Sequence, residues 1–80
     1  MVTIRQIKAA RALLDWSQVD LASQSGNSYA TIARLEALDG EIAGRAGTVS
    51  KIVAALESGG VEFIMENGDG GAGVRLRKAR

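Results

Sequence analysis

Two short stretches with helical spacing lie on either side of a glycine in residues 17–37. Ser17 is followed three residues later by Asp20, and this combination is typical of the N-terminus of a helix. That helix must end at Gly26, because glycine readily adopts the left-handed conformation found at helix C-termini. Ser28 can cap a second helix only two residues later. The segment therefore predicts two short helices joined by a tight turn.

Helical periodicity extends on both sides of this pair. The helix predicted at residues 3–14 has one inner stripe: Ile4, Ile7, Ala10 or Arg11, and Leu14. The helix that starts at Gln18 is predicted to bury Val19 and either Leu21 or Ala22. After an ordered loop at residues 39–47, Thr48 is predicted to cap a helix that ends at Gly59 and Gly60. The expected fold class is mostly α, with four to five helices in residues 1–60.

The spacing of apolar residues changes to a period of two after residue 60. Apolar and charged side chains alternate in residues 61–66 and again in residues 74–77, and the turn-rich segment 67–73 separates them. This pattern predicts a C-terminal β-hairpin with glutamates on one strand and arginines on the other. The alternative for the same residues is a disordered glycine-rich tail.

The residue inventory excludes most kinds of chemistry. The chain has 80 residues without cysteine or histidine, so thiol chemistry, imidazole acid-base catalysis, disulfides and the usual zinc sites are absent. No nucleophile and base form a set, and we expect neither an enzyme nor a cofactor. Apolar runs are only a few residues long, so we expect no membrane span and no secretory signal, and a cytoplasmic location.

The net charge of +1 conceals a segregation of charge along the chain. Residues 1–14 carry three basic residues and no acid, and residues 74–80 carry four basic residues and no acid. Residues 15–73 are correspondingly acidic. Such segregation allows one basic face in a nearly neutral protein, as nucleic-acid binding requires. The alternative is a solvated surface with a basic disordered tail.

Two short helices joined by a tight turn are the layout of a helix-turn-helix, whose second helix enters the major groove of DNA. Residues 17–36 read SQVDLASQSGNSYATIARLE. This string resembles the S-Q-x-x-L-A-x-x-x-G-[apolar]-S-x-x-T-I-x-R-x-E pattern of the XRE (Cro and lambda repressor-like) family of transcriptional regulators. The resemblance covers roughly residues 3–58. It implies a lambda repressor-like DNA-binding domain at 1–60. The hairpin and basic tail at 61–80 lie beyond the resemblance, and we expect them to serve in dimerisation because an open two-stranded unit leaves an edge that a twofold mate can cover.

The resemblance implies that a set of side chains contacts DNA. Gln18, at the exposed start of its helix, would donate to a phosphate, and Thr31 would meet the sugar-phosphate backbone. Arg34 could donate two hydrogen bonds to guanine. The alternative is that Arg34 forms an ion pair on the protein surface. The full predicted set is Gln18, Ser28, Tyr29, Ala30, Thr31, Ala33, Arg34 and Arg45.

Other positions in the motif are predicted to build it. Arg11 and Glu36 match a pair that, in several family members, orients the first helix against the third. Asn27 replaces the usual apolar residue after the turn glycine, so either an Asx-type hydrogen bond ties the turn or the third helix is seated differently. Trp16, just before the Ser17 cap, is predicted to lie in the core.

The sequence predicts a transcription regulator that binds double-stranded DNA with helix 28–37 in the major groove. We expect it to bind a near-palindromic operator as a homodimer. The alternative is a protein-interaction module, such as an antitoxin or an antiactivator adaptor, that binds a partner through the hairpin. The basic end, Arg75 to Arg80, is a candidate arm for the phosphate backbone. Helix 48–58 and the hairpin are both candidate dimer surfaces, and the hairpin residues predicted there are Val61, Phe63, Ile64, Met65, Val74 and Leu76.

Overall fold

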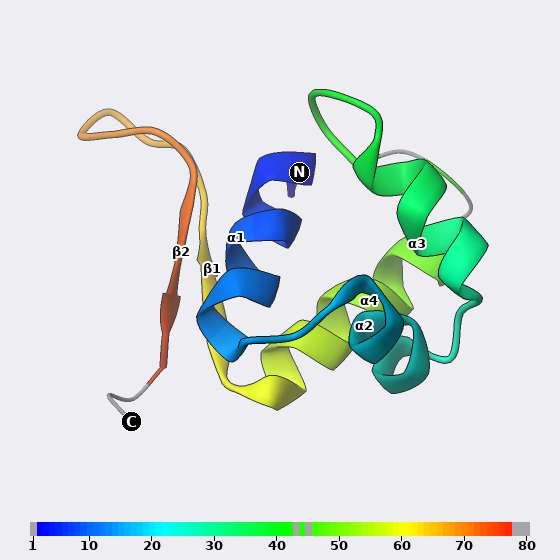
Figure 1. The fold of residues 1–80 in the computed structure, drawn as a ribbon. Helices are drawn as coiled ribbons and strands as arrows, with labels where there is room; N and C mark the ends of the chain where they lie inside the picture. Colours follow the sequence, from blue (N-terminus) through cyan, green and yellow to red (C-terminus); the bar gives the residue numbers. More distant parts are fainter. Residues whose placement is uncertain (1, 43, 45, 78–80) are drawn as a thin grey trace.

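The computed structural model describes residues 2–42, 44 and 46–77. Four helices are followed by one antiparallel hairpin in these residues (Figure 1). The elements are α1 (Ile4–Leu14), α2 (Gln18–Ser25), α3 (Tyr29–Glu36), α4 (Ala46–Gly59), β1 (Val61–Ile64) and β2 (Gly73–Leu76). The predicted mostly helical fold with a C-terminal hairpin is confirmed. In Figure 1 the hairpin and α3 lie at opposite ends of the molecule, with α1 between them.

The predicted helix starts and the central turn are confirmed by hydrogen bonds. The hydroxyl of Ser17 accepts from the backbone N–H of Asp20, and the Asp20 carboxylate accepts from the N–H of Ser17. Ser28 accepts from the N–H of Thr31 in the same way. Gly26 ends α2 with φ 69° and ψ 25°, in the left-handed region. Local sequence therefore sets these boundaries, because each terminal group is satisfied by a residue within three positions.

The C-terminus of α1 has the same backbone conformation but no glycine. Asp15 has φ 57° and ψ 39° there, and its N–H donates to the carbonyls of Ala12 and Arg11. A Cβ in this region costs free energy that glycine does not incur, so we expect Asp15→Gly to raise the free energy of unfolding by about 0.5–1 kcal/mol. Urea unfolding followed by Trp16 fluorescence would measure the change. Asp15→Ala keeps the Cβ, and an equal gain from that variant would show that backbone strain is not the cause.

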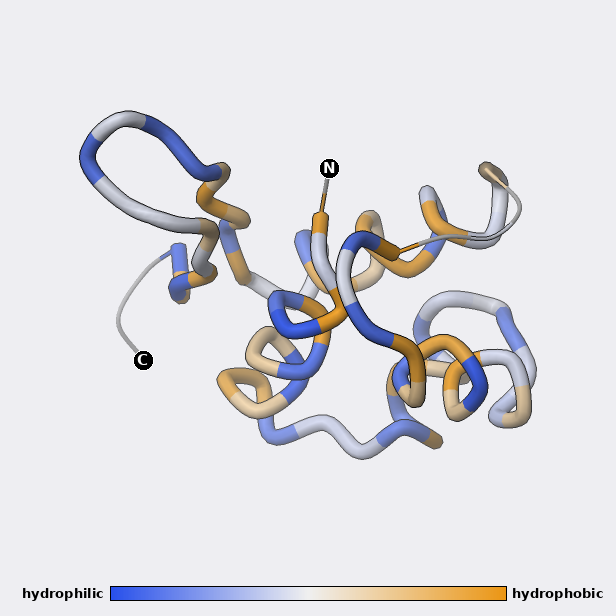
Figure 2. Tube along the Cα trace, turned by 90° about the horizontal axis from the view of Figure 1, so that it is seen from above, coloured by the Kyte–Doolittle hydropathy of each residue, from blue (hydrophilic) through white to orange (hydrophobic). Residues whose placement is uncertain are grey.

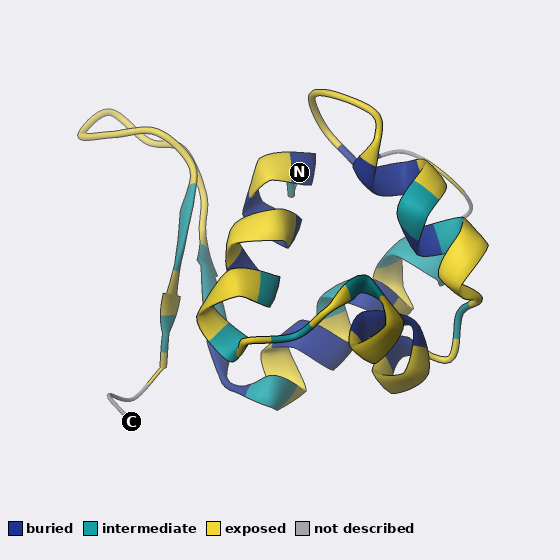
Figure 3. Ribbon diagram, viewed as in Figure 1, coloured by how far each residue is buried: buried dark blue, intermediate teal, exposed yellow. Residues whose placement is uncertain are grey.

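One hydrophobic cluster joins all four helices to the first strand, and its largest fully buried members are Ile4, Ile7, Leu21, Ile32, Ile52, Leu56 and Val61. Figure 3 shows the buried stripes of the helices facing one another. The predicted burial of Val19 is wrong, because its side chain is 61% exposed. Helix α2 buries Leu21, Ala22 and Ser25 instead. Val19 precedes Leu21 by two residues, which places it on roughly the opposite side of the helix.

Helix α4 differs from its predicted limits at both ends. It begins at Ala46, so the prediction that Thr48 caps it is wrong. Alanine, the most favourable helix former, stands at the first helical position, and the Thr48 hydroxyl lies inside the helix, so it does not set the start. At the other end Gly59 is still helical, and Gly60 has φ 116°. A Cβ on Gly59 would lie 2.8 Å from Cδ1 of Leu14 and 2.9 Å from the Trp16 ring, so glycine allows this close approach.

The loop after α3 is anchored by a residue that its glycine-rich sequence did not single out. Ile42 is buried, and its N–H donates to the carbonyl oxygen of Val2 at 2.9 Å. The N–H of Ile4 donates to the carbonyl oxygen of Gly40, also at 2.9 Å. The N-terminal residues and the loop thus pair backbone to backbone, which fixes the start of α1 beside the end of α3.

The hairpin predicted from the period-two pattern is confirmed. Glu62 lies opposite Arg75, and Phe63 lies opposite Val74. The Glu62 carboxylate also accepts a hydrogen bond from Arg75. At the tip, the side-chain oxygen of Asn67 accepts from the N–H groups of Asp69 and Gly70, at 2.7 and 3.1 Å. In Figure 2 the tip is mostly hydrophilic, and hydrophobic and hydrophilic residues alternate along the strands below it.

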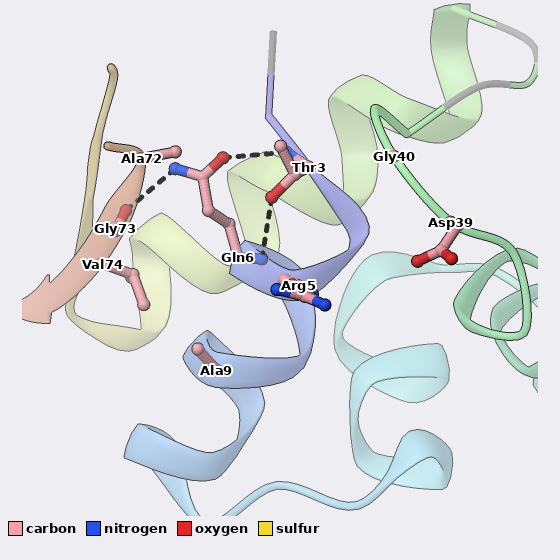
Figure 4. A pocket seen from close by; sticks show the side chains of 9 residues that line it. All are labelled: Thr3, Arg5, Gln6, Ala9, Asp39, Gly40, Ala72, Gly73 and Val74. Atoms are coloured by element: carbon pink, nitrogen blue, oxygen red, sulfur yellow. Dashed lines mark hydrogen bonds between the residues drawn. The ribbon is translucent and has the colours of Figure 1, made fainter. Parts of the chain in front are cut away.

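A buried glutamine fastens the hairpin to α1. Gln6 is 3% exposed, and its Nε2 donates to the carbonyl oxygens of Ile64 at 3.0 Å and Gly73 at 2.8 Å. Its Oε1 accepts from the N–H of Thr3 at 2.8 Å, as part of a capping box at the start of α1 (Figure 4). Both amide hydrogens and the amide oxygen of Gln6 are therefore used. Local sequence patterns do not reveal the role of Gln6, because its partners lie 58 and 67 residues away.

Candidate nucleic-acid interface

The turn between α2 and α3 is held by backbone and side-chain hydrogen bonds. The N–H of Asn27 donates to the carbonyl oxygen of Ala22 at 3.0 Å. The Asn27 side-chain amide donates to the Ser25 hydroxyl at 3.1 Å, and Ser25 is itself buried. The asparagine therefore ties the turn, but as a donor to a hydroxyl and not as the acceptor of an Asx turn. This bond connects the turn to the last residue of α2.

Helix α3 has a buried side and an exposed side. Ile32, Leu35 and Glu36 are buried. The opposite side consists of the exposed Tyr29, Ala30 and Arg34, with Thr31 and Ala33 half-buried at its margins. Tyr29 is 54% exposed. Six of the predicted DNA-contacting residues thus lie on or beside one side of α3: Ser28, Tyr29, Ala30, Thr31, Ala33 and Arg34.

Two hydrogen bonds between Ser28 and Thr31 hold the first turn of α3. Besides accepting from the N–H of Thr31 at 3.1 Å, the Ser28 hydroxyl lies 2.9 Å from the Thr31 hydroxyl. One of the two hydroxyls donates to the other, so both side chains have a defined orientation. Ser28 therefore acts first as the helix cap. The hydrogen-bonding capacity that remains on both oxygens faces solvent, since the bond between them is exposed.

An ion pair sits beneath the motif at the predicted positions. The guanidinium of Arg11 donates to both carboxylate oxygens of Glu36, at 2.8 and 2.7 Å. The side chain of Glu36 is 3% exposed and that of Arg11 is 19% exposed. A third donor of Arg11 bonds the carbonyl oxygen of Trp16 at 2.9 Å. The pair therefore joins α1, the residue before α2, and the end of α3.

The hydrogen bond from Arg11 to Glu36 raises the pKa of the guanidinium above its usual value, and the negative charge of Glu36 adds to the effect, against the opposing effect of burial. A pKa that is higher in the folded state stabilises the fold at all pH values below the ordinary arginine pKa. This stabilisation is lost only as the pH rises through the raised value, in strongly alkaline solution. At neutral pH, Arg11 therefore keeps its positive charge, and small changes of pH do not alter the charge that it contributes to the pair.

Gln18 takes part in the same network. Its Nε2 donates to Oε1 of Glu36 at 3.2 Å, and the side chain is half-buried. Gln18 was predicted to lie at the exposed start of its helix and to donate to a phosphate. The bond to Glu36 holds the amide beside the N-terminus of α2 and leaves one of its two hydrogens for another acceptor. A residue predicted to contact DNA is thus positioned by a residue predicted to be structural.

This arrangement agrees with comparison to known proteins. A helix-turn-helix family model matches residues 7–59, from the first half of α1 to the last residue of α4. The chain belongs to the XRE-type helix-turn-helix family. The match supports a DNA-binding helix-turn-helix regulator. The chain matches no curated protein significantly. Among the residues that the structure describes, no helix has the length and apolar character needed to cross a membrane.

The motif helices of this XRE-type domain carry little exposed charge. Arg34 is the one exposed cation in α2 and α3, and Asp20 is the one exposed acid. Two further acids, Asp39 and Glu41, lie in the loop after α3. Arg45, also predicted to contact DNA, lies outside the described residues. Charge on α2 and α3 themselves thus contributes little attraction for DNA, and donors at helix N-termini gain in importance.

The basic end of the XRE-type chain is partly tied to the fold. The Arg77 guanidinium donates to the carbonyl oxygen of Glu57, near the end of α4, at 2.9 Å. Arg75 bonds the carboxylate of Glu62. The prediction of a flexible basic arm is therefore wrong for these two arginines, because each has a partner on a neighbouring element. Lys78 and Arg80 lie outside the described residues.

The apolar residues of the hairpin divide into three groups. Val61 is fully buried in the core of its own chain, so it presents no surface to another molecule. Phe63, Val74 and Leu76 are partly buried against that core. Ile64 and Met65, at the end of β1, are exposed. Five of the six hairpin residues predicted for dimerisation therefore retain some accessible apolar surface.

Proposed function

We propose that this chain is a sequence-specific transcription regulator that binds a near-palindromic operator as a homodimer, with recognition helix 28–37 in the major groove. The observation that carries the proposal is the division of α3 into two sides. One side is fixed by the core and by the Arg11–Glu36 pair, and the other exposes Tyr29, Ala30 and Arg34. A helix held in this way has defined side-chain positions to offer to base edges.

The exposed side suggests how the operator is read. Arg34 can donate two hydrogen bonds to the O6 and N7 atoms of guanine. Ala30 and Ala33 can contact only apolar groups, such as a thymine methyl. Gln18 and the free N–H groups of helix N-termini are suited to phosphates. So few base-reading donors leave much of the specificity to half-site spacing and DNA shape.

The size of the molecule fits binding to two half-sites. Its longest dimension is 35 Å. Helix-turn-helix dimers contact half-sites about 34 Å apart, one turn of B-form DNA. Two copies placed side by side about a twofold axis can therefore present their α3 helices to successive turns of the major groove on one face of the duplex.

Selection of bound sequences from random DNA with the full chain tests the proposal. We expect an enriched motif with twofold symmetry whose half-sites are about one helical turn apart, and an affinity that falls as salt increases. Weak binding with no enriched motif would contradict the proposal and favour the adaptor alternative. A single enriched half-site without symmetry would support DNA recognition and contradict the homodimer.

Arg34→Ala tests the reading of α3 directly. We expect a loss of affinity for the selected operator of about 10- to 100-fold per half-site, with relaxed preference at one guanine position. Fluorescence anisotropy against operators changed at that position would measure both effects. Lys51→Ala is the matched control, because it removes one exposed cation from α4, outside the two motif helices. Equal losses from the two variants would show that Arg34 acts only through its charge.

A further inference from the structure

The tip of the hairpin carries an asparagine followed by a glycine. Asn67 and Gly68 lie between β1 and β2, and both residues are exposed. The N–H of Asn67 donates to the carbonyl oxygen of Gly70 at 2.9 Å, and this bond closes the tip. The chain has one other asparagine, Asn27, in the turn before α3. The two asparagines therefore allow a comparison of the same side chain in two environments.

The side-chain amide of Asn67 is bonded through its oxygen and free at its nitrogen. Oδ1 accepts from the N–H groups of Asp69 at 2.7 Å and Gly70 at 3.1 Å. Nδ2 has no hydrogen-bond partner among the described residues. Two donors on Oδ1 withdraw electrons from the amide carbon, and they suit an oxygen on which negative charge develops. The amide carbon of Asn67 is therefore activated towards attack, and Nδ2 is accessible as a leaving group.

The backbone nitrogen of Gly68 is the adjacent nucleophile. Its N–H makes no hydrogen bond to any residue that the structure describes, so no bond has to break before the nitrogen loses its proton. Gly68 also has no Cβ that would crowd a ring formed between this nitrogen and the Asn67 side chain. The two reacting groups thus stand next to each other in the chain, and both are solvent-accessible.

The surroundings of the tip leave room for the rotation that this attack requires. The backbone at Asn67 must turn so that the nitrogen of Gly68 reaches the side-chain carbon. Glycines at positions 68, 70 and 71 tolerate a wide range of backbone angles. A Cβ placed on any of these three glycines would meet no atom within 4 Å, so neighbouring elements leave these positions open. Packing against the rest of the fold therefore does not oppose the rotation.

We infer that Asn67 is a site of spontaneous intramolecular deamidation. Base from solvent takes the proton of the Gly68 N–H, and the nitrogen bonds to the side-chain carbon of Asn67. The bond from that carbon to Nδ2 breaks, and Nδ2 takes a proton from water and leaves as ammonia. Water then adds to either carbonyl carbon of the resulting succinimide and breaks that carbon's bond to the ring nitrogen. The products are aspartate and isoaspartate, and the net reaction consumes one water and releases one ammonia.

Asn27 is protected against the same reaction. Its Nδ2 donates to the hydroxyl of Ser25 at 3.1 Å, and Ser25 is itself buried. The residue that follows it, Ser28, has a Cβ, and its hydroxyl caps α3 by accepting from the N–H of Thr31. Ring closure at Asn27 would require the turn and this cap to come apart. The fold therefore directs deamidation to the hairpin tip, and the inference is independent of the proposed function.

The product differs from Asn67 in charge and in backbone. The new carboxylate lowers the formal net charge from +1 to 0. In isoaspartate the backbone runs through the former side chain, which displaces the carbonyl that bound the N–H groups of Asp69 and Gly70. We expect faster hydrogen exchange at these two amides. The amides of β1 and β2 should be unaffected, because Gln6 still holds the carbonyl oxygens of Ile64 and Gly73.

Incubation of the full chain in neutral buffer at physiological temperature, followed by peptide mass spectrometry, tests the inference. We expect the peptide that contains Asn67 to gain about 1 Da over days, with isoaspartate as the larger product. The peptide that contains Asn27 should gain less by about 10-fold or more. Gly68→Ala is the matched variant, because its Cβ would meet no atom within 4 Å. We expect it to keep the fold and to slow the reaction about 10-fold or more.

Three results would overturn the inference. They are equal gains at the two asparagines, an unchanged rate in Gly68→Ala, and aspartate without isoaspartate, since direct hydrolysis of the amide forms no isoaspartate. The chain unfolded in guanidinium chloride supplies a second measurement. We expect unfolding to accelerate the reaction at Asn27 but not at Asn67. A rate at Asn67 that is about 10-fold lower in the folded chain would contradict activation by the N–H groups of Asp69 and Gly70.

Discussion

Glu36→Ala is expected to lower the free energy of unfolding by about 3 kcal/mol, and the melting temperature by about 10–20 °C. The substitution leaves the Arg11 guanidinium without the carboxylate that accepts two of its hydrogen bonds, and leaves Gln18 without its acceptor. The Arg11 side chain is 19% exposed, so water can solvate part of the stranded charge, and we expect the lower end of the range for a broken buried pair. Thermal and urea unfolding would measure the loss.

Two companion variants make this prediction specific. Arg34→Ala removes an exposed charge from the same helix, and we expect a change in stability within about 0.5 kcal/mol. The double variant Arg11→Met with Glu36→Leu replaces the pair by apolar side chains, and we expect it to recover most of the stability that Glu36→Ala loses. Equal losses of melting temperature from Glu36→Ala and Arg34→Ala would reject the division between a structural and a DNA-contacting residue on α3.

Gln6→Glu is expected to lower the free energy of unfolding by about 3 kcal/mol at neutral pH. The side-chain amide of Gln6 donates to the carbonyl oxygens of Ile64 and Gly73 at 3.0 and 2.8 Å. A carboxylate has no hydrogen to donate, so it would place a buried negative charge against both oxygens. We expect the hairpin to open first, and hydrogen exchange of the β1 and β2 amides would report it.

The loss from Gln6→Glu should depend on pH. Burial without a donor raises the pKa of the introduced carboxyl in the folded state above its unfolded value. The penalty is therefore full above the raised pKa, and it is relieved as the pH falls towards the unfolded value of about 4.3. Gln6→Met removes the same donors without adding charge, so its stability relative to the unmodified chain should not show this recovery. Parallel pH profiles for the two variants would contradict a buried charge as the cause.

The helical part of the fold could be read from local sequence because its signals act over a few residues. Ser17, Gly26 and Ser28 satisfy or terminate helix ends within three positions, and this is why the limits of α2 and α3 agree with prediction. Val19 and Thr48 were misjudged for the same reason. The first is apolar but turns away from the core, and the second could cap a helix but lies inside one.

The candidate site was predictable in its parts but not in its connections. The exposed side of α3 follows from where Ile32 and Leu35 point, and this is a matter of helical geometry. The bond from Gln18 to Glu36 depends on how closely α2 and α3 pack, and spacing along the chain does not specify that distance. The position of Gln18 is therefore set by its bond to the Arg11–Glu36 pair.

The sequence by itself determined the helix-turn-helix, its caps, the Arg11–Glu36 pair and the existence of a hairpin, since each depends on local hydrogen bonds, periodicity or a motif of fixed spacing. Only the tertiary structure decided where the hairpin lies. Gln6 holds it against α1, Arg77 holds it against α4, and Val61 joins it to the core. The hydrogen bonds of Gln6 and Arg77 to these elements join residues twenty or more positions apart, and the energy of such contacts depends on the assembled packing of side chains, which no local pattern encodes.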